Sequence, residues 1–217
     1  MQLFAESVTW QGPFGIASAV AVFFLLGYVF GSIPTGLWLC RMLHHIDIRE
    51  YGSGNIGATN VFRTVGPKTA ALVLLCDMLK GMVPLYVAEH VLAGLPLAVA
   101  LTALGALLGH NYSFLLRFQG GKGVATGLGL FLYMLPCSAG IGFLCWIVLV
   151  ALTRYVSLGS VVGALAAAGS AWILDYPWAY AVFGTLAALF VILRHKDNLK
   201  RLANGTESKI KPGHMKK

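Results

Sequence analysis

The chain has 217 residues, of which 58% are hydrophobic and only 11% are charged. Soluble domains carry about 25% charged residues, so this composition excludes an ordinary water-soluble protein and indicates an integral membrane protein. The net charge of +8 would suit nucleic acid, but the order of the charges along the chain gives it a topological explanation. We therefore expect no nucleic-acid partner.

Apolar runs along the chain predict seven membrane-spanning helices. Pro34, in the segment GSIPTG (31–36), is expected to kink or interrupt the first run, and the fourth run is short and glycine-rich. Without a linker or a clear internal repeat, the predicted fold is an all-α polytopic membrane protein. It forms a single domain (1–217), with a core over about 14–208 and a basic tail (209–217). The seven runs cover residues 14–40, 69–88, 91–116, 123–135, 138–153, 157–174 and 177–193.

Lysines and arginines sort to one side when the seven runs are threaded through a bilayer. Of the 16 residues, 15 fall on one side, none falls on the other, and Lys80 lies within a span. Because positively charged loops remain in the cytoplasm, that side is predicted to be cytoplasmic, with the N-terminus outside and the C-terminus inside. The same side holds every polar motif with chemical character. It comprises residues 41–68, 117–122, 154–156 and 194–217.

Several kinds of site are excluded by what the sequence lacks. The four cysteines form no CxxC pair, and no Cys, His or Asp cluster has metal-ligand spacing, so we expect neither a disulfide framework nor a metal. The GxSxG pattern of a nucleophile elbow does not occur. No histidine is followed five positions later by an aspartate, the arrangement typical of one large class of lipid acyltransferases. No cofactor is expected.

The first polar motif is GSGNIGATNVFR, over residues 52–63. Its glycines permit tight turns and a close approach of peptide N–H groups to an anion. Arg63 at its end carries a planar fork suited to phosphate. A merely flexible loop is the alternative, but the mixture of amides, hydroxyls and a final arginine favours anion binding. The neutral donors are Ser53, Asn55, Thr59 and Asn60.

The second motif is GGKGVAT, over residues 120–126 at the start of the fourth apolar run. Glycines and Lys122 ahead of a helix N-terminus are suited to holding phosphate. The motif is not a nucleotide-binding P-loop, because Leu116 stands where the first glycine is required and Gly123 where Ser or Thr is required. The alternative is a lysine that only anchors the membrane topology.

The third motif is HKDNLKRLANGTE, over residues 195–207. His195 and Asn198 are three positions apart, so they are predicted to share one face of a helix that continues past the membrane. Gly205 suits the end of that helix. A basic tail often only contacts the lipid surface, which would explain the later lysines but not the histidine and asparagine.

Three smaller features lie near these motifs. The turn Arg154–Ser160 offers hydroxyl groups that could contribute to a ligand site. Asp77 and Lys80 lie three residues apart within a span, where either charge alone would be costly, and are expected to neutralise each other. His110 and Asn111 end the third run, and either line a site beside the GGKG turn or cap the helix at the interface.

Together with GSIPTG, the three motifs resemble the bacterial acyl-phosphate:glycerol-3-phosphate acyltransferase family over about residues 31–209. The resemblance implies transfer of an acyl group from a fatty acyl phosphate to the 1-hydroxyl of glycerol 3-phosphate. The products would be lysophosphatidic acid and phosphate, in the first acylation of phospholipid synthesis. It further implies a multi-pass protein of the bacterial inner membrane, acting as a monomer, with its active site facing the cytoplasm.

The resemblance also assigns residues to the two substrates. Ser53 would hold the acyl phosphate together with the loop that follows it, namely Gly54, Asn55, Gly57, Thr59 and Asn60. The glycerol 3-phosphate would be held by Arg63, Lys122, Ser160, His195 and Asn198. Glu207 would support the third motif. The catalytic set would be Ser53, Arg63, Lys122, His195 and Asn198.

These residues are rich in anion binders and poor in general bases, which suits substrates that are already activated. We expect direct attack of the hydroxyl without an acyl-enzyme, the proton passing to a phosphate oxygen of the donor. His195 is the one competing base, although the resemblance implies that it orients substrate. A small transporter or exchanger of phosphorylated solutes is the alternative function. It is disfavoured because transporters place such groups near the midplane of the membrane, often between inverted repeats.

Overall fold

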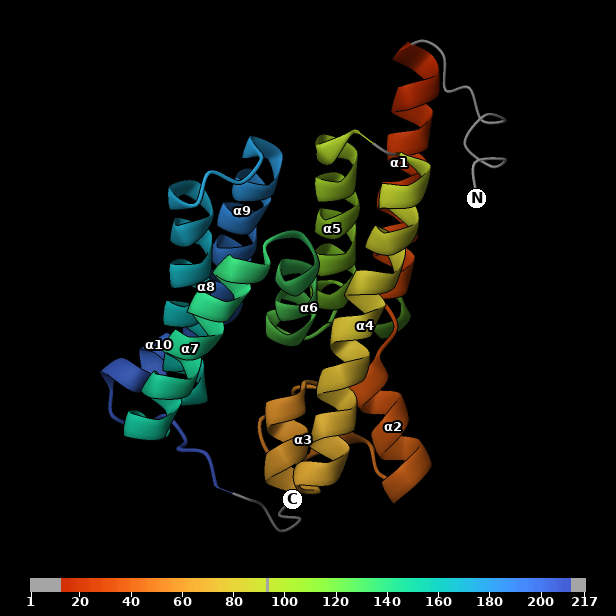
Figure 1. Cartoon of the computed structure of the whole chain (residues 1–217). Coiled ribbons are helices and arrows are strands. Elements are labelled where there is room, and N and C mark those ends of the chain that lie inside the picture. Colours follow the sequence, from red (N-terminus) through yellow and green to blue (C-terminus); the bar gives the residue numbers. More distant parts are fainter. Residues whose placement is uncertain (1–12, 93, 212–217) are drawn as a thin grey trace.

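The computed structural model describes residues 13–92 and 94–211, and every regular element within these ranges is helical (Figure 1). Two single turns of tighter helix, η1 (Ile48–Glu50) and η2 (Phe114–Leu116), lie among ten α-helices. The α-helices are α1 (Pro13–Gly31), α2 (Thr35–His44), α3 (Ala58–Thr64), α4 (Pro67–Val91), α5 (Pro96–Asn111), α6 (Val124–Met134), α7 (Pro136–Thr153), α8 (Val156–Ile173), α9 (Trp178–Arg194) and α10 (Lys196–Ala203).

Prolines mark where several of these helices begin. Pro67, Pro96 and Pro136 each stand at the first position of a helix, where a missing N–H costs nothing because the first turn has no internal acceptor for it. Pro34 instead precedes α2 and separates it from α1, which ends at Gly31. The predicted interruption of the first apolar run at GSIPTG is thereby confirmed.

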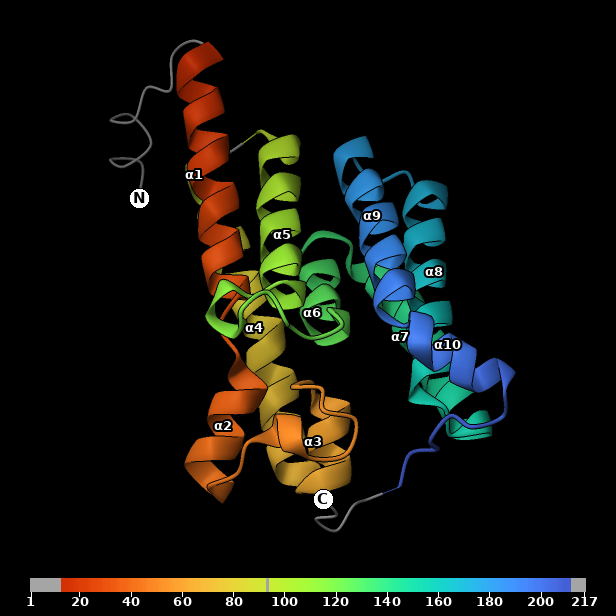
Figure 2. The ribbon, with the colours of Figure 1, turned by 180° about the vertical axis from the view of Figure 1, so that it is seen from behind.

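The helices form two groups with α6 between them (Figures 1 and 2). One group contains α1, α4 and α5, with α2 and α3 at its lower end in Figure 1. The other contains α7, α8 and α9, with α10 at its lower end. The most extensive packing joins α1 to α5 and α7 to α8, and α6 packs against both α4 and α7.

Glycines allow α1 and α5 to approach until their backbones touch. A Cβ added at Gly31 would lie 2.0 Å from the carbonyl oxygen of Ala106. One added at Gly105 would lie 2.2 Å from the carbonyl oxygen of Phe24. Because lipid tails are as apolar as the helices, association depends on such close van der Waals packing, which small residues spaced four apart permit.

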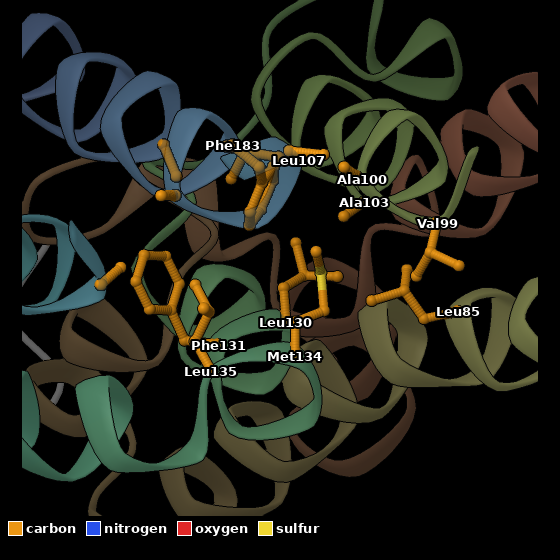
Figure 3. Packing of buried hydrophobic residues seen from close by; sticks show 14 of the residues in the cluster. Leu85, Val99, Ala100, Ala103, Leu107, Leu130, Phe131, Met134, Leu135 and Phe183 are labelled. Carbon is orange, nitrogen blue, oxygen red and sulfur yellow. The ribbon is translucent and has the colours of Figure 1, made fainter. Parts of the chain in front are cut away.

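The main hydrophobic core lies where α5, α6 and α9 meet (Figure 3). Leu107, Leu130 and Leu135 are fully buried there, and the rings of Phe131 and Phe183 lie 6.0 Å apart between centroids. This core therefore joins the two helix groups through the short helix α6.

The number of complete membrane spans is the point on which sequence and structure differ. A helix occupies each of the seven apolar runs, but five segments are long and apolar enough to span, or six if α9 and α10, bent by 58°, count as one. With 11 residues at about 1.5 Å each, α6 is about half as long as a hydrocarbon core is thick. Seven complete spans are therefore not confirmed.

We predict that Gly105→Val destabilises the protein because its side chain would force α5 away from the α1 backbone. The expected loss is about 2 kcal/mol of unfolding free energy or more, measured by thermal denaturation in detergent. Gly140→Val is the matched control, because a Cβ at Gly140 on α7 meets nothing within 4 Å. Equal losses in the two variants would contradict the proposed role of the α1–α5 contact.

Candidate active site

A cavity of about 990 Å³ lies between the two helix groups. Its polar end is lined by the loop before α3, the turn before α6, the start of α8, the junction of α9 and α10, and the segment after α10. Its other end is lined by apolar residues of α6, α7, α8 and α9. The cavity brings together all twelve residues that the sequence assigned to a site: Ser53, Gly54, Asn55, Gly57, Thr59, Asn60, Arg63, Lys122, Ser160, His195, Asn198 and Glu207.

The loop before α3 is shaped from within by Asn60. Its side-chain N–H₂ donates to the carbonyl oxygens of Ile48, Tyr51 and Asn55 at 2.8–3.2 Å, and its Oδ1 accepts from the N–H of Ser53 at 2.9 Å. Asn60 is 2% exposed, so its amide is occupied by the loop itself. Asn60 was predicted to contact a ligand, whereas the structure uses this side chain to hold the loop in shape.

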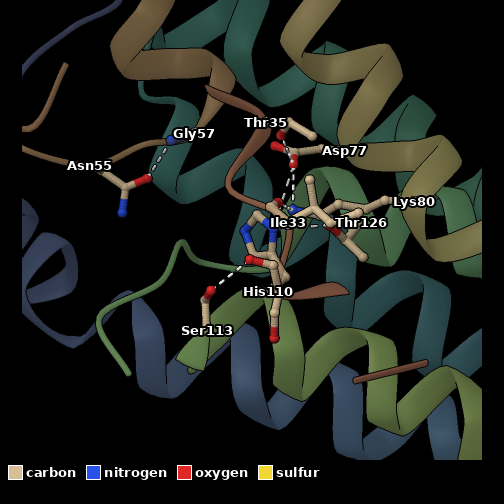
Figure 4. A network of polar contacts seen from close by, with 10 residues as sticks. Ile33, Thr35, Asn55, Gly57, Asp77, Lys80, His110, Ser113 and Thr126 are labelled. Atoms are coloured by element: carbon tan, nitrogen blue, oxygen red, sulfur yellow. Dashed lines mark hydrogen bonds and ion pairs between the residues drawn. The ribbon is translucent and has the colours of Figure 1, made fainter. Parts of the chain in front are cut away.

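The same loop leaves other donors available at the cavity. Asn55 accepts from the N–H of Gly57 at 2.8 Å, which leaves its side-chain N–H₂ free of partners among the described residues (Figure 4). Ser53 and Thr59 also have hydroxyl groups without a hydrogen-bond partner there. Gly54 adopts a φ of 69°, in the left-handed region that favours glycine, so the turn depends on this residue.

Arg63, on α3, reaches across the mouth of the cavity. Its Nη2 donates to the carbonyl oxygen of Ser208 at 2.9 Å, while its Nε is buried and has no partner within the part of the chain that the structure describes. Burial lowers the pKa of Arg63, although a guanidinium remains charged at neutral pH. A half-buried cation with a buried, unused donor is suited to an anion that enters the cavity.

Lys122 meets Asn198 across the cavity. Its Nζ donates to Oδ1 of Asn198 at 2.5 Å, and burial lowers the pKa of Lys122 despite the opposing charge of Glu207. The GGKG turn thus reaches the third motif.

Glu207 is the acceptor around which this end of the site is organised. Its Oε1 accepts from Asn198 at 2.7 Å and from Ser157 at 2.8 Å, and its Oε2 accepts from Arg201 at 2.8 Å. Burial would raise the pKa of Glu207, but these hydrogen bonds outweigh it and hold the pKa below its usual value. The carboxylate therefore stays charged and orients Asn198. Ser157 belongs to the turn whose hydroxyl groups the sequence analysis singled out, whereas Arg201 carries no signal in the sequence that separates it from other arginines.

His195 lies just past the last residue of α9, where the chain bends into α10. Its Nδ1 lies 2.7 Å from the carbonyl oxygen of Val191, so Nδ1 carries the proton and donates it. Burial and the neighbouring Lys122 lower the pKa of His195 to about 4. The imidazole is therefore neutral at pH 7, and its Nε2 can accept a hydrogen bond. The helix predicted to continue past the membrane instead bends by 58° at His195, and His195 and Asn198 both line the cavity from this junction. Gly205 (φ 68°) follows the end of α10, as predicted.

Ser160 lines the cavity on α8, but its hydroxyl donates to the carbonyl oxygen of Val156 at 2.8 Å. In this rotamer the Ser160 hydroxyl can only accept a hydrogen bond from a ligand.

Arg194 is a residue that the sequence interpretation treated only as a topological charge. Its Nε and Nη2 donate to the carbonyl oxygens of Gly121 and Gly120 at 3.0 and 2.9 Å. Arg194 thereby anchors the turn that carries Lys122.

A buried polar network supports the same turn from the other side (Figure 4). Lys80 forms an ion pair of 2.7 Å with Asp77, as the sequence predicted, and Thr35 donates to Asp77 at 2.5 Å. His110 lies 3.1 Å from the hydroxyl of Thr126, and its carbonyl oxygen accepts from the N–H of Gly121 at 2.9 Å. Of the two roles considered for His110, lining the site is the one observed.

The fold and the cavity define a membrane-embedded helical protein whose site combines anion-binding groups with an apolar end. Such a site suits a phosphorylated substrate and a fatty chain.

Comparison with known proteins assigns this architecture to a family. The profile of the glycerol-3-phosphate acyltransferase family matches residues 21–205, and the chain belongs to that family. It is 43% identical over 190 residues to the glycerol-3-phosphate acyltransferase of Syntrophomonas wolfei, covering 88% of this chain and 96% of the relative. It is 44% identical to that of Rippkaea orientalis, covering 86% and 90%.

Solved structures agree. The crystal structure of PlsY (YgiH), an integral membrane glycerol 3-phosphate acyltransferase, in its glycerol 3-phosphate form matches with a TM-score of 0.83 and 34% identity. The match covers 88% of this chain and 96% of that one. The lysophosphatidic acid form of the same protein matches with a TM-score of 0.82. The chain is thus a membrane-embedded acyltransferase, as the motifs indicated.

We predict that His195 makes the protein sensitive to mild acid. Its pKa is lowered in the folded state, so the unfolded chain takes up the proton first as the pH falls. The stability that neutral His195 contributes is therefore complete above about pH 6.5 and is lost as the pH falls towards 4, by about 3 kcal/mol in total. Denaturation in detergent at pH 7 and 4.5 should show a smaller acid loss in His195→Gln than in the wild type. Equal losses would contradict the buried, neutral state.

Proposed function

We propose that the protein transfers the acyl group of a fatty acyl phosphate to the 1-hydroxyl of glycerol 3-phosphate, releasing lysophosphatidic acid and phosphate. The observation that carries the proposal is one cavity with two separate sets of anion-binding groups at its polar end and an apolar end beyond them. Two phosphate groups and a fatty chain require those three parts. No cofactor and no metal enter the proposed reaction.

The loop before α3 is suited to the phosphate of the donor. Ser53 and Thr59 offer hydroxyl donors, Asn55 offers its side-chain N–H₂, and all three face the same cavity. We assign Asn60 to the shape of this loop rather than to direct contact, because its amide is already used. Neutral donors hold a leaving phosphate without binding it so tightly that product release fails.

Two cations are suited to glycerol 3-phosphate. Arg63 and Lys122 stand on different walls of the cavity, with Asn198 beside Lys122. Charge-assisted hydrogen bonds to a phosphate are stronger than those to a carbonyl. We therefore expect the substrate phosphate to displace the carbonyl of Ser208 from Arg63, and to use the buried Nε as well.

The chemistry follows from a donor that is already activated. The 1-hydroxyl oxygen attacks the acyl carbonyl carbon, the bond from that carbon to the phosphate oxygen breaks, and phosphate leaves. The hydroxyl proton passes to an oxygen of the departing phosphate. Neutral His195, with Nε2 able to accept a hydrogen bond, orients the hydroxyl for this attack.

We further propose the topology and location. Counting α6 with its flanking turns as a crossing gives seven crossings, with the C-terminus in the cytoplasm. The charge sorting of 15 of 16 lysines and arginines supports this, since the positive segments then all remain inside. The active site would face the cytoplasm of a bacterial inner membrane, where water-soluble glycerol 3-phosphate is available. The N-terminal segment lies outside the described residues. One chain supplies every site residue, so a monomer suffices.

The reaction is tested with purified protein in detergent, given palmitoyl phosphate and glycerol 3-phosphate. We expect phosphate release that requires both substrates, together with a stoichiometric amount of lysophosphatidic acid. Without a vesicle there is no transport to observe. Failure of release, alongside exchange of phosphorylated solutes in reconstituted vesicles, would favour a transporter instead.

Arg63→Lys separates the two phosphate sets. Loss of the planar fork should raise the KM for glycerol 3-phosphate by about 30-fold, equivalent to about 2 kcal/mol, and leave the KM for the acyl phosphate nearly unchanged. Arg117→Lys is the control, an exposed arginine after η2 that does not line the cavity. A change confined to the acyl-phosphate KM would contradict the assignment of Arg63.

In the same assay, His195→Gln should raise the KM for glycerol 3-phosphate while keeping most of kcat. A large loss confined to kcat would instead indicate base catalysis.

A further inference from the structure

On four helices, the last residue that lines the cavity also belongs to the main hydrophobic core. On α6 this last lining residue is Phe131. On α7, which runs in the opposite direction, it is Ala139. On α8 it is Ala167, and on α9, which runs in the opposite direction to α8, it is Ala187. Three of these four last residues are alanines, and Phe131 is the one with a large side chain.

The ring of Phe131 is held from behind. Leu135 and Phe183 lie beyond it, are 0% and 2% exposed, and belong to the hydrophobic core rather than to the cavity wall (Figure 3). A Cβ added at Gly184 on α9 would lie 3.2 Å from the ring of Phe131. Because this core is densely packed, the ring cannot swing aside to lengthen the cavity.

We propose that Phe131 closes the acyl-chain end of the cavity and thereby sets the longest acyl chain that the enzyme uses efficiently. The proposal rests on the proposed function, since it requires the fatty chain to lie in the apolar end. Each methylene buried in this end improves binding about fourfold. Once the chain reaches the ring, a further methylene has no space, and the gain is replaced by a clash.

A second path for the acyl chain leads between α4 and α7 into the lipid, and the experiment below distinguishes it from the path that ends at Phe131. Leu74 on α4 and Phe143 on α7 also line the cavity, and are 39% and 45% exposed. The helices α4 and α7 pack against α6 but not extensively against each other, so a chain could leave between them into the lipid. A chain on that path would meet no wall. The buried core residues Leu135 and Phe183 behind the ring of Phe131 favour the inner path, because a chain that follows it ends against packed side chains.

The experiment compares Phe131→Ala with Phe143→Ala, two identical truncations at the two ends of these paths. The kcat/KM of purified enzyme is measured with lauroyl, palmitoyl and stearoyl phosphate at saturating glycerol 3-phosphate. Phe131→Ala should raise the stearoyl-to-lauroyl ratio by about 15-fold, the gain from roughly two further buried methylenes at about fourfold each. Phe143→Ala should leave the ratio unchanged. An unchanged ratio in Phe131→Ala, or an equal shift in Phe143→Ala, would overturn the proposal.

A second variant protects the test from a failure of Phe131→Ala to fold. Ala167→Leu narrows the same level from α8 and should lower the stearoyl-to-lauroyl ratio, with activity on lauroyl phosphate retained. Binding of lysophosphatidic acids of the same three chain lengths should follow the same order in each variant. This readout does not depend on the donor. If acyl phosphates were inactive with the wild type while lysophosphatidic acid binding still shifted, the proposed donor would be wrong and Phe131 would keep its role. If neither readout shifted in either variant, the inference would fail.

Discussion

The carboxylate of Glu207, in the segment after α10, is buried at the polar end of the cavity, and three donors surround it and hold it in its charged form. Ser157 comes from α8, Arg201 and Asn198 come from α10, and Asn198 in turn accepts from Lys122. A buried charge without such partners would be strongly destabilising. The interactions that accommodate the carboxylate therefore also fix the distance between α8, α10 and the turn before α6. The position of the Lys122 ammonium group in the cavity depends on these interactions.

In the helix group that contains α4, a buried carboxylate is likewise neutralised by a basic side chain. Lys80 and Asp77 neutralise each other in α4, and Lys80 also donates to the carbonyl oxygen of Ile33 at 2.8 Å, in the break between α1 and α2. His110 extends this network to α6 and to the GGKG turn. That turn is thus held from one side by α5 and from the other by Arg194 on α9. The GGKG turn therefore connects the two helix groups.

Much of the site was predictable because its residues lie in short, contiguous motifs. A glycine-rich loop with Arg63, a glycine-flanked Lys122 and the His195–Asn198 pair each indicate phosphate binding from local order alone. What could not be predicted is which donors remain free. Asn60 is used by its own loop, and Arg194 serves the turn rather than only the membrane topology. Both outcomes depend on partners that the sequence does not place next to them.

By itself, the sequence determined that the protein is helical and embedded in a membrane, and that its phosphate-suited motifs follow the positive charges. These properties depend on composition and on the order of residues, which need no tertiary contact. Only the tertiary structure decided that the three motifs line one cavity, and that Phe131 is the last residue of α6 to line it. Both depend on how helices far apart in the chain pack, because a lining alanine and a buried one are identical in sequence.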